Sequence, residues 1–537
     1  MPAYQYEPFA YIRPPELDGG RSQAPIAIVG AGPVGLTLAI DLALRGIKCV
    51  VLDDNNVVSV GSRAICWAKR TLEIFDRLGV GERMLDAGVT WTVGRLFHGA
   101  EEVYSFDLLP EHGHKYPAFI NLQQYLVEQY LVERCHDFPD LIDLRFLNKV
   151  VGHAETSTGV AVDVETPDGP YRLQAVYLVA CDGANSPTRR RMGLDFVGQS
   201  FEEQFLIADI EMTQSPFGNS GVAERWFWFD PPFHAGKSAL LHQQPNGIYR
   251  IDLQLSGNVD ARLEATPEQV LPRIRAIVGD KPFRLDWVSV YRFRCAKLDR
   301  FVHGRVIFCG DSAHVVSPFG ARGGNGGVQD ADNLGWKLAA LIQGIAGPGL
   351  LESYNAERGH GSAENILNSA RATNFMTPKS PIEALFRSET LRLAHSQPFA
   401  QKLINSGRLS LPCSLEGHSL QTPGEAPLRP GSVVLDLPLA DGSWLVEHVQ
   451  GDFVLVGFGD IALPEVADLR RLGIDQAGPY PGFASTGDYA ATRYGTGLAY
   501  LFRPDGHVAA VFAQPSADQV SAAMQRALGA VDCAVAA

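Results

Sequence analysis

The sequence predicts an α/β fold in which a parallel sheet with helices is interrupted by an antiparallel sheet. Short apolar runs at Ile26–Gly30 and Lys48–Leu52 enclose a helical pattern, which is the order of a parallel strand–helix–strand unit. From Glu202 to Asp299 the pattern changes to alternation of apolar and polar residues, which is typical of antiparallel strands. A further apolar run at Arg305–Cys309 and a long helical pattern follow, so we expect the parallel sheet to resume after the insertion.

The composition is that of an ordinary globular protein of 537 residues, long enough for two to four domains. The net charge of −14 argues against nucleic acid or an anionic membrane as a partner. No apolar run approaches the roughly 20 residues of a membrane span, and the N-terminus lacks a signal-peptide pattern, so we expect a cytoplasmic protein. The eight cysteines include no C-x-x-C pair and no metal-binding cluster, so we expect reduced thiols and no metal.

A glycine-rich turn follows the first strand. The sequence GAGPVG leads into a helical pattern, and Asp53 ends the next strand about 20 residues later, which is the dinucleotide fingerprint of a Rossmann-like domain. Gly30 would make the tight turn, Gly32 would let the backbone approach a pyrophosphate, and Gly35 would let the helix lie close to the strand. The predicted contacts from this loop are Gly30, Ala31, Gly32, Pro33, Val34 and Gly35. The alternative is a packing turn without a ligand.

The acidic residues after the second strand bear on which nucleotide is bound. Asp53 would accept hydrogen bonds from an adenosine ribose, and Asp54 adds negative charge. This pair favours FAD or NAD over NADP, because a 2′-phosphate would be repelled.

A second glycine-rich loop lies in the stretch Gly304–Leu341. A predicted strand ends at Gly310 and Asp311, and five glycines stand between Gly320 and Gly327. The apolar residues that follow recur at helical spacing: Val328, Ala331, Leu334, Leu338 and Ile342. The positive end of this helix would point at a bound anion. A tight turn before a packed helix is the alternative, and no Gly-Lys-Ser/Thr closes a Walker-type loop.

Two further segments are candidates for cofactor contacts. Arg63, on the polar loop Gly61–Arg63, could reach a pyrophosphate or remain a solvated surface residue. The strand Tyr177–Ala180 ends in CDGANSPTRR, where Asp182 stands at a strand tip that opens a helix.

Three motifs in this order resemble a known family. They are GAGPVG with Asp53, then CDGANSPTRR, and then GRVIFCGDSAH followed by PFGARGGNGG and DADNLGWKLA. Together they resemble the single-component FAD-dependent aromatic hydroxylases, in particular the 3-(3-hydroxyphenyl)propionate hydroxylase and phenol hydroxylase branch. The resemblance covers roughly Pro25 to Thr373.

The resemblance implies a division of the chain into domains. Together with the composition and the strand alternation, it divides the chain into an N-terminal arm over 1–24, a discontinuous FAD-binding domain over 25–200 and 300–375, a substrate-binding sheet domain over 201–299, a helical linker over 376–431 and a C-terminal domain over 432–537 that resembles thioredoxin. The last domain lacks C-x-x-C and would be redox-inactive.

The resemblance also implies which residues hold FAD. Besides the first glycine loop and Asp53, it implies Asp54, Arg63, Gln124, Val151, Asp182, Gly183, Gly310, Asp311, Pro318, Gly323, Gly324 and Asn325. The backbone amides of Gly324 and Asn325 would face the flavin pyrimidine. The sequence departs from the family at Arg322, where glutamine is frequent, and at Gly324, where a larger apolar residue is usual.

The activity implied by the resemblance is hydroxylation of a phenolic substrate. NADPH or NADH would reduce FAD, O₂ would form a flavin C4a-hydroperoxide, and one oxygen would pass to the ring. The catalytic candidates are His242, Arg250 and Pro318, and the substrate candidates are Trp226, Trp228 and His242. Each has an ordinary structural alternative: a sheet histidine, a sheet-edge cation, a stiffened loop and core aromatics.

Other functions remain open at this point. The segment Trp226–Pro231 loosely echoes an element of flavin-dependent halogenases, although its lysine partner is missing. A flavin oxidase or reductase would share the same binding motifs, and a non-catalytic flavoprotein that mediates assembly is a further alternative. A homodimer is possible.

Overall fold

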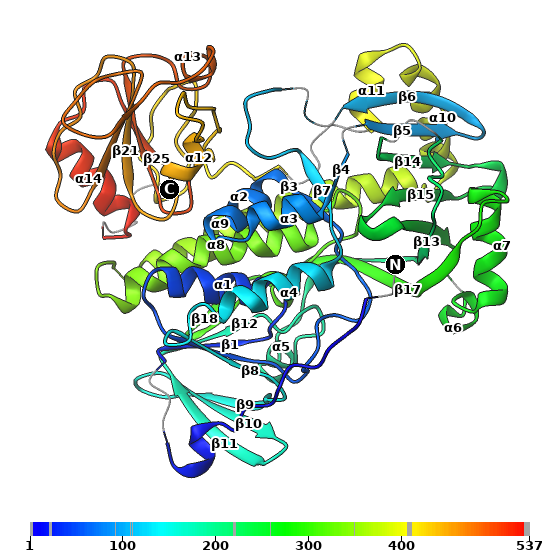
Figure 1. Ribbon diagram of the computed structural model, residues 1–537, viewed down its shortest axis with the longest axis horizontal. Helices are drawn as coiled ribbons and strands as arrows, with labels where there is room; N and C mark the ends of the chain where they lie inside the picture. The colour runs from blue at the N-terminus through cyan, green and yellow to red at the C-terminus, as the bar shows by residue number, and fades with distance from the viewer. Residues whose placement is uncertain are drawn as a thin grey trace.

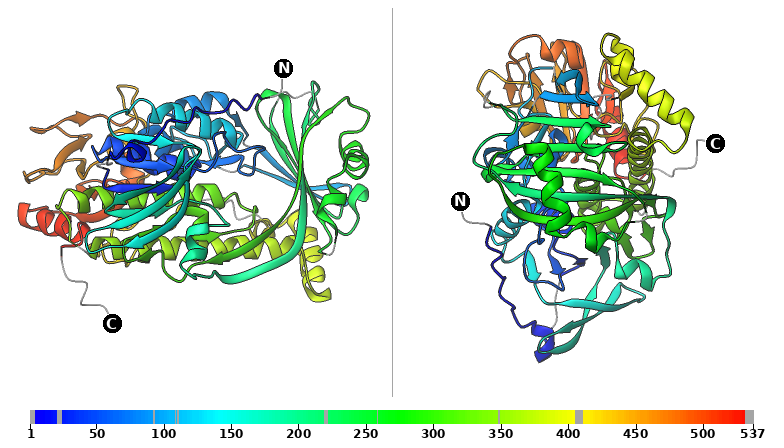
Figure 2. Two further views of the ribbon diagram at one scale, coloured as in Figure 1. Left: turned by 90° about the horizontal axis from the view of Figure 1, so that it is seen from below. Right: turned by 90° about the vertical axis from the view of Figure 1, so that its right-hand side faces the viewer.

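The computed structural model describes residues 4–20, 24–91, 93–107, 109, 111–218, 222–257, 259–347, 349–404 and 411–530. Figure 1 shows a central region of helices and parallel strands, with a large antiparallel sheet on one side and the C-terminal region on the other. The left view in Figure 2 shows the same arrangement from below. The N-terminal segment runs along the outside of the central region.

The central sheet has six strands in the order β18-β19-β12-β1-β2-β8. Its bounds are β1 Ile26–Val29, β2 Cys49–Leu52, β8 Ile142–Arg145, β12 Tyr177–Ala180, β18 Val302–His303 and β19 Val306–Phe308. β1 pairs in parallel with both β2 and β12, and β19 pairs in parallel with β12. The chain therefore leaves this sheet after β12 and returns to it at β18 and β19.

Four helices lie on one side of this sheet, and a three-stranded sheet lies on the other (Figure 1). The helices are α1 Pro33–Leu44, α4 Gln124–Cys135, α8 Gly323–Ile342 and α9 Gly349–Met376, and the strands are β9 Lys149–Glu155, β10 Val160–Thr166 and β11 Gly169–Ala175. Their apolar side chains form one continuous buried core with the central strands. The short helices η1 Pro15–Asp18, α2 Lys69–Arg77, α3 Gly81–Ala87 and α5 Pro187–Arg191 lie around it.

The large sheet has eight strands in the order β20-β17-β13-β16-β15-β14-β5-β6. The bounds are β5 Val93–His98, β6 Glu101–Asp107, β13 Val197–Glu211, β14 Glu224–Phe229, β15 Ser238–Gln243, β16 Ile248–Leu255, β17 Arg284–Lys297 and β20 His314–Val315. The predicted insertion did not include β5 and β6, which come from the first part of the chain and complete one edge. One face packs against α7 (Pro267–Val278), next to the shorter α6 (Ala261–Glu264).

A small sheet joins the other face of the large sheet to the central region. Its strands are β3 Cys66–Ala68, β4 Val89–Thr90 and β7 Phe119–Asn121. The Asn121 side-chain amide donates to the Gln243 carbonyl oxygen on β15 at 2.7 Å. This contact places the residues around Cys66 opposite the polar side chains of β15 and β16.

The C-terminal region has its own mixed sheet, in the order β23-β22-β21-β24-β25. Two helices precede it, α10 Pro381–Ala394 and α11 Pro398–Ile404. The sheet and its helices are α12 Leu445–His448, β21 Val454–Phe458, β22 Arg470–Ile474, β23 Gly482–Phe483, α13 Tyr489–Tyr494, β24 Leu498–Phe502, β25 Val508–Phe512 and α14 Ala517–Ala527. The turn Pro504–Gly506 joins β24 to β25. Among the described residues, no helix is long and apolar enough to cross a bilayer, and no acidic, histidine and cysteine side chains gather as a metal site.

Candidate functional site

The turn between β1 and α1 has the geometry that its three glycines predict. Gly30 adopts φ +106°, and its N–H donates to the Leu52 carbonyl oxygen at 2.8 Å. A Cβ at Gly35 would lie 2.0 Å from the Gly30 carbonyl oxygen, so only glycine allows this close approach of helix and strand. Gly32 is the N-cap of α1, and no side chain caps this helix. A Cβ at Gly32 would meet no described atom within 4 Å. The first-turn N–H groups of α1 therefore face space that a ligand can fill.

Asp53 ends β2 and closes this turn from the neighbouring strand. Its carboxylate accepts hydrogen bonds from the Ala31 N–H at 2.6 Å and the Asn55 N–H at 2.8 Å. Burial raises the pKa of Asp53, and Asp54 beside it, which is exposed, adds to the rise. Val151 lies in β9, three residues beyond Asn148, whose N–H donates to the Asp53 carbonyl oxygen at 2.8 Å. Asp53, Asn55 and Asn148 thus form one edge of the turn.

Asp182 lies at the end of β12, immediately beside Gly30. A Cβ at Gly30 would come 2.5 Å from the Cys181 carbonyl oxygen, which shows how closely the two strand ends approach. One Asp182 oxygen accepts from the Thr188 N–H at 3.0 Å, and the other, Oδ1, is buried without a partner among the described residues. Gly183 follows in the left-handed region with φ +77°. A buried carboxylate oxygen without a donor indicates a ligand hydroxyl or amide at this position.

The second glycine-rich segment packs directly against the first. Gly310, at the end of β19, adopts φ +70°, and a Cβ there would lie 3.0 Å from Val34 of α1. A Cβ at Gly327 of α8 would lie 2.6 Å from the same valine. The N-terminal turns of α1 and α8 are therefore held side by side around Val34.

A buried charged cluster fixes the turn at Gly310. The Asp330 carboxylate accepts from the Gly310 N–H at 3.1 Å and from Arg358 Nε at 2.6 Å, and it lies 2.6 Å from His314 Nε2. Burial alone would raise the pKa of Asp330, but His314 and Arg358 hold it below its usual value. His314 thus has a structural contact with the carboxylate that fixes this turn.

The first turn of α8 presents free backbone donors. The first backbone bond of the helix runs from the Gly326 N–H to the Arg322 carbonyl oxygen, and no side chain caps the N-terminus. The N–H groups of Gly323, Gly324 and Asn325 are therefore left for a ligand. The Asn325 side chain is occupied, because it accepts from Ala68 N–H and Thr71 Oγ1 and donates to the carbonyl oxygens of Cys66 and Ala321.

Asp311 stands between these two helix ends. Asp311 is exposed to solvent on one side. The protein around its carboxyl nevertheless removes much of the water, and this desolvation raises the pKa of the carboxyl. The positive charge of Arg63 opposes that rise in the pKa of Asp311, together with the neighbouring His314, so Arg63 lies near Asp311. Gln124 instead fixes the loop that carries Arg63: its side chain accepts from Ala64 N–H at 3.1 Å and donates to Ser59 Oγ at 3.0 Å.

Arg322 and Pro318 belong to the loop before α8. Arg322 is buried, and its guanidinium donates to Asn365 Oδ1 of α9 at 2.9 Å. This bond joins the loop before α8 to α9. Pro318 is exposed at the other end of the loop.

These features fit FAD. Two uncapped helix N-termini supply N–H groups for phosphate and carbonyl oxygens, and Gly32 leaves room beside the first of them. Asp182 Oδ1 and the accessible Asp311 would be suitable acceptors for hydroxyl groups of such a ligand.

His242 and Arg250 lie on the face of the large sheet that is turned away from α7. They occupy opposed positions on β15 and β16. The Arg250 guanidinium is held by two bonds to Asp209, at 2.8 and 2.7 Å, so its charge is compensated. His242 Nε2 lies 3.4 Å from Asp252 Oδ2, and Nδ1 is buried without a partner among the described residues. Burial lowers the pKa of His242 to about 4, with the charge of Arg225 adding to the effect.

The structure separates Trp226 and Trp228 from His242. Side chains alternate along β14, and both tryptophans lie on the α7 face, in one cluster with Phe97, Phe217 and Phe233. The two tryptophans therefore pack as core aromatics, which is the structural alternative for these residues, and they do not share a face with the other substrate candidate, His242. Arg225 and Phe227 occupy the positions that share a face with His242.

Sequence reasoning missed three residues on this face: Arg225, Asp252 and Tyr291. Arg225 lies directly opposite His242, and Asp252 and Tyr291 follow on β16 and β17. Burial raises the pKa of Tyr291, and the charge of Asp252 adds to it. The available signal was Arg225 directly before the aromatic run Trp226–Phe229, and Asp252 between two apolar residues of its strand, but neither showed which face turns to the cofactor.

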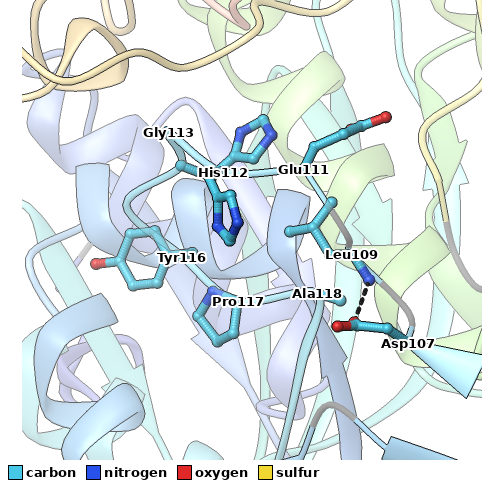
Figure 3. A pocket seen from close by; sticks show the side chains of 9 residues that line it. Asp107, Leu109, Glu111, His112, Gly113, Tyr116, Pro117 and Ala118 are labelled. Atoms are coloured by element: carbon cyan, nitrogen blue, oxygen red, sulfur yellow. Dashed lines mark hydrogen bonds between the residues drawn. The ribbon is translucent and has the colours of Figure 1, made fainter. Parts of the chain in front are cut away.

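A separate pocket of about 210 Å³ lies in the segment between β6 and β7 (Figure 3). It is lined by Asp107, Leu109, Glu111, His112, Gly113, His114, Tyr116, Pro117 and Ala118. This segment contacts the C-terminal region, since Arg493 donates to the carbonyl oxygens of Gly113 and His112. None of the residues predicted to bind cofactor or substrate lines this pocket.

Comparison with known proteins gives consistent results. The model of the FAD binding domain family matches residues 23–369. A flavin-dependent monooxygenase of Mycobacteroides abscessus is 32% identical over 502 residues, covering 90% of this chain and 96% of the relative. A 3-(3-hydroxy-phenyl)propionate/3-hydroxycinnamic acid hydroxylase of Mycolicibacterium smegmatis is 28% identical over 421 residues, covering 78% of this chain and 73% of the relative. The crystal structure of the flavin-dependent monooxygenase PieE, in complex with FAD and substrate, has the same fold, with a TM-score of 0.78 at 22% identity over 94% of this chain and 98% of PieE.

Proposed function

The chain belongs to the FAD-binding family of flavin-dependent monooxygenases, and we propose that it hydroxylates a phenolic ring with O₂ and NADPH or NADH. The observation that carries this proposal is the pair of uncapped helix N-termini of α1 and α8, packed around Val34 beside the unpaired Asp182 oxygen. A relative named as a hydroxylase of a hydroxyphenyl acid supports the phenolic class of substrate.

The proposed FAD contacts divide along the dinucleotide. The loop Gly30–Gly35 and Asp53 would bind the adenosine and pyrophosphate, with Arg63 as a nearby cation. Asp182 and Asp311 would accept hydrogen bonds from hydroxyl groups, and the N–H groups of Gly323, Gly324 and Asn325 would bind flavin oxygen atoms. When bound, FAD supplies the electron and oxygen chemistry of the reaction.

The large sheet would supply the substrate side of the site. Its polar face carries His242, Asp252 and Tyr291, and the small sheet with Cys66 lies opposite. Arg250 would hold the sheet together through Asp209 and not contact the substrate as a free cation. Pro318, at the exposed end of the loop before α8, would border the substrate.

The functions of the outer regions are also proposals. The C-terminal sheet, with β21 parallel to β22 and antiparallel to β24, supports a thioredoxin-like fold. Its role would be structural, because C-x-x-C is absent from the sequence. A homodimer stays a prediction.

The proposal is tested with the purified full-length protein. We expect a yellow protein with a flavin spectrum, or one that becomes yellow with added FAD. In a panel of phenols, at least one should stimulate NADPH or NADH oxidation and give a matching amount of hydroxylated product. A colourless protein that cannot be reconstituted, or oxidation that yields only hydrogen peroxide with every phenol, would contradict the proposal.

A further inference from the structure

Arg225 is a buried arginine without a counter-charge. It is 8% exposed, its Nε is buried without a partner, and its guanidinium forms neither a hydrogen bond nor an ion pair with any other described residue. The neighbouring Arg95, on the adjacent strand β5, is instead held by Glu224 at 2.6 and 3.0 Å. A buried cation that lacks a partner is costly in free energy, so its position indicates an anionic or strongly accepting ligand.

The surroundings of Arg225 would strengthen an ion pair between its guanidinium and a bound anion. The guanidinium carbon lies 5.5 Å from the ring centre of Trp91 and 6.0 Å from that of Phe227, so its neighbours are largely apolar. A weakly polar environment increases the energy of any charge–charge contact made there. Asp252, the acid on this face near His242, pairs with His242 and not with Arg225.

His242 offers a second unpaired group directly opposite Arg225. The two residues are cross-strand partners, so their side chains project from the same face. A proton on Nε2 serves the Asp252 carboxylate at 3.4 Å, which leaves the buried Nδ1 as an acceptor. One donor and one acceptor thus stand side by side, and a hydroxyl group satisfies both.

This pair lies beside the flavin end of the proposed cofactor site. Trp91 and Cys66 pack in one apolar cluster with Ala321, which precedes the first turn of α8 by two residues. Burial raises the pKa of the Cys66 thiol, and the charge of Arg225 opposes the rise, which confirms their proximity. The other charged or titratable groups that face this space are Arg63, Asp209, Arg250, Asp252 and Tyr291.

We propose that Arg225 binds the phenol oxygen of the substrate and stabilises it as phenolate, with His242 as the acceptor of the hydroxyl proton. This rests on the proposed function, because it names the group that this site recognises. The neutral hydroxyl donates to His242 Nδ1 and accepts from Arg225. When the O–H bond breaks, the proton forms a bond to Nδ1, and the imidazolium is stabilised by Asp252 on its other nitrogen. The Nε2–H bond of the imidazolium then breaks, and that proton passes to the Asp252 carboxylate and from there to solvent, since the Asp252 side chain is 18% exposed. Arg225 stays with the phenolate oxygen, whose negative charge makes the ring more nucleophilic.

The test follows the ionisation of a bound chromophoric phenol. A panel of nitrophenols, whose phenolates absorb visible light, is titrated with pH in the FAD-loaded protein without NADPH or NADH. We expect the pKa of at least one bound probe to lie about one unit or more below its value in water, as an adjacent cation causes. Arg225→Gln should remove the shift, Arg225→Lys should restore part of it, and His242→Gln should leave most of it.

Arg95→Gln is the matched control, because it removes an arginine from the same sheet whose charge is already paired on the opposite face. Its bound probe should ionise as in the parent protein. An unshifted pKa in the parent protein, a shift that survives Arg225→Gln, or a panel in which no phenolate is bound in preference to its phenol would overturn the proposal. The readout needs no turnover, so it can succeed or fail independently of the hydroxylation assay.

Discussion

Arg503 of the C-terminal region and Glu357 of α9 form a fully buried double ion pair, with nitrogen–oxygen distances of 2.6 and 3.0 Å. Arg503 also binds Asp505, and Glu357 accepts from Lys337 of α8 at 2.7 Å. The same network reaches α2, because Arg70 donates to the Asp505 carbonyl oxygen at 2.7 Å. The C-terminal region is thus joined to the helix whose first turn faces the proposed cofactor.

We expect Arg503→Met to destabilise the protein by about 3–5 kcal/mol, because it leaves buried carboxylates without their cation. The measurement is urea unfolding at neutral pH. Arg429→Met is the control, since Arg429 is 51% exposed and pairs with Glu416 on the surface, where the loss should stay within about 1 kcal/mol. Equal effects of the two substitutions would show that the buried network does not hold the C-terminal region.

Gly32 and Gly35 should respond differently to alanine. A Cβ at Gly32 meets no described atom, so Gly32→Ala should leave the stability of the apoprotein unchanged and weaken FAD binding about 10-fold or more, since the methyl group enters the ligand space. A Cβ at Gly35 lies 2.0 Å from the Gly30 carbonyl oxygen, so Gly35→Ala should destabilise the apoprotein itself. Fluorescence titration with FAD and unfolding of the apoprotein separate the two effects. Unchanged FAD affinity in Gly32→Ala would place the cofactor elsewhere.

The burial of His242 predicts an acid-sensitive contribution to stability. Its pKa falls from 6.5 to about 4 in the folded state, so between these values the unfolded state binds more protons. The contribution is present above pH 6.5 and is lost as the pH falls towards 4, with a loss of about 2–3 kcal/mol. His242→Gln cannot titrate, so its stability should fall less over this range in urea unfolding measured at successive pH values. Parallel pH profiles for the two proteins would contradict the lowered pKa.

The two faces of β14 should carry different functions. Trp228 packs with Phe97 and Phe233 on the α7 face, so Trp228→Ala should cost about 3–5 kcal/mol in stability and leave the affinity for a phenolic ligand within twofold. Phe227→Leu, beneath the Arg225 guanidinium, should weaken that affinity with a smaller loss of stability. Ligand titration and unfolding are measured on both variants. A loss of ligand affinity in Trp228→Ala without a loss in Phe227→Leu would show that the α7 face of β14 contacts the substrate.

The cofactor loops were predictable from the sequence because they are local. The turns at Gly30–Gly35 and Gly320–Gly327 depend on residues close in the chain, and their glycine conformations follow from close backbone approaches. The approach of α1 and α8 around Val34 was suggested only by the family resemblance, because the two segments are almost 300 residues apart in the sequence.

The substrate face was harder to predict. Alternation in ERWFWF divides Arg225 and Phe227 from Trp226 and Trp228, but the sequence does not state which set faces α7. That choice depends on packing of the whole sheet, including β5, whose pairing with β14 is parallel and far in sequence. The lack of an ion-pair partner for Arg225 depends on which side chains surround it in the folded sheet, and those come from strands that are distant in the sequence.

The central claim is that the protein transfers one oxygen atom from O₂ to a phenolic ring. The direct measurement is mass spectrometry of the product formed under ¹⁸O₂ in ordinary water, with NADPH or NADH and a phenol that stimulates turnover. We predict a product that carries one ¹⁸O atom for each ring hydroxylated, in an amount that follows cofactor oxidation. A product that carries oxygen only from water, or turnover that consumes O₂ and leaves every phenol unchanged, would contradict the assignment as a hydroxylase.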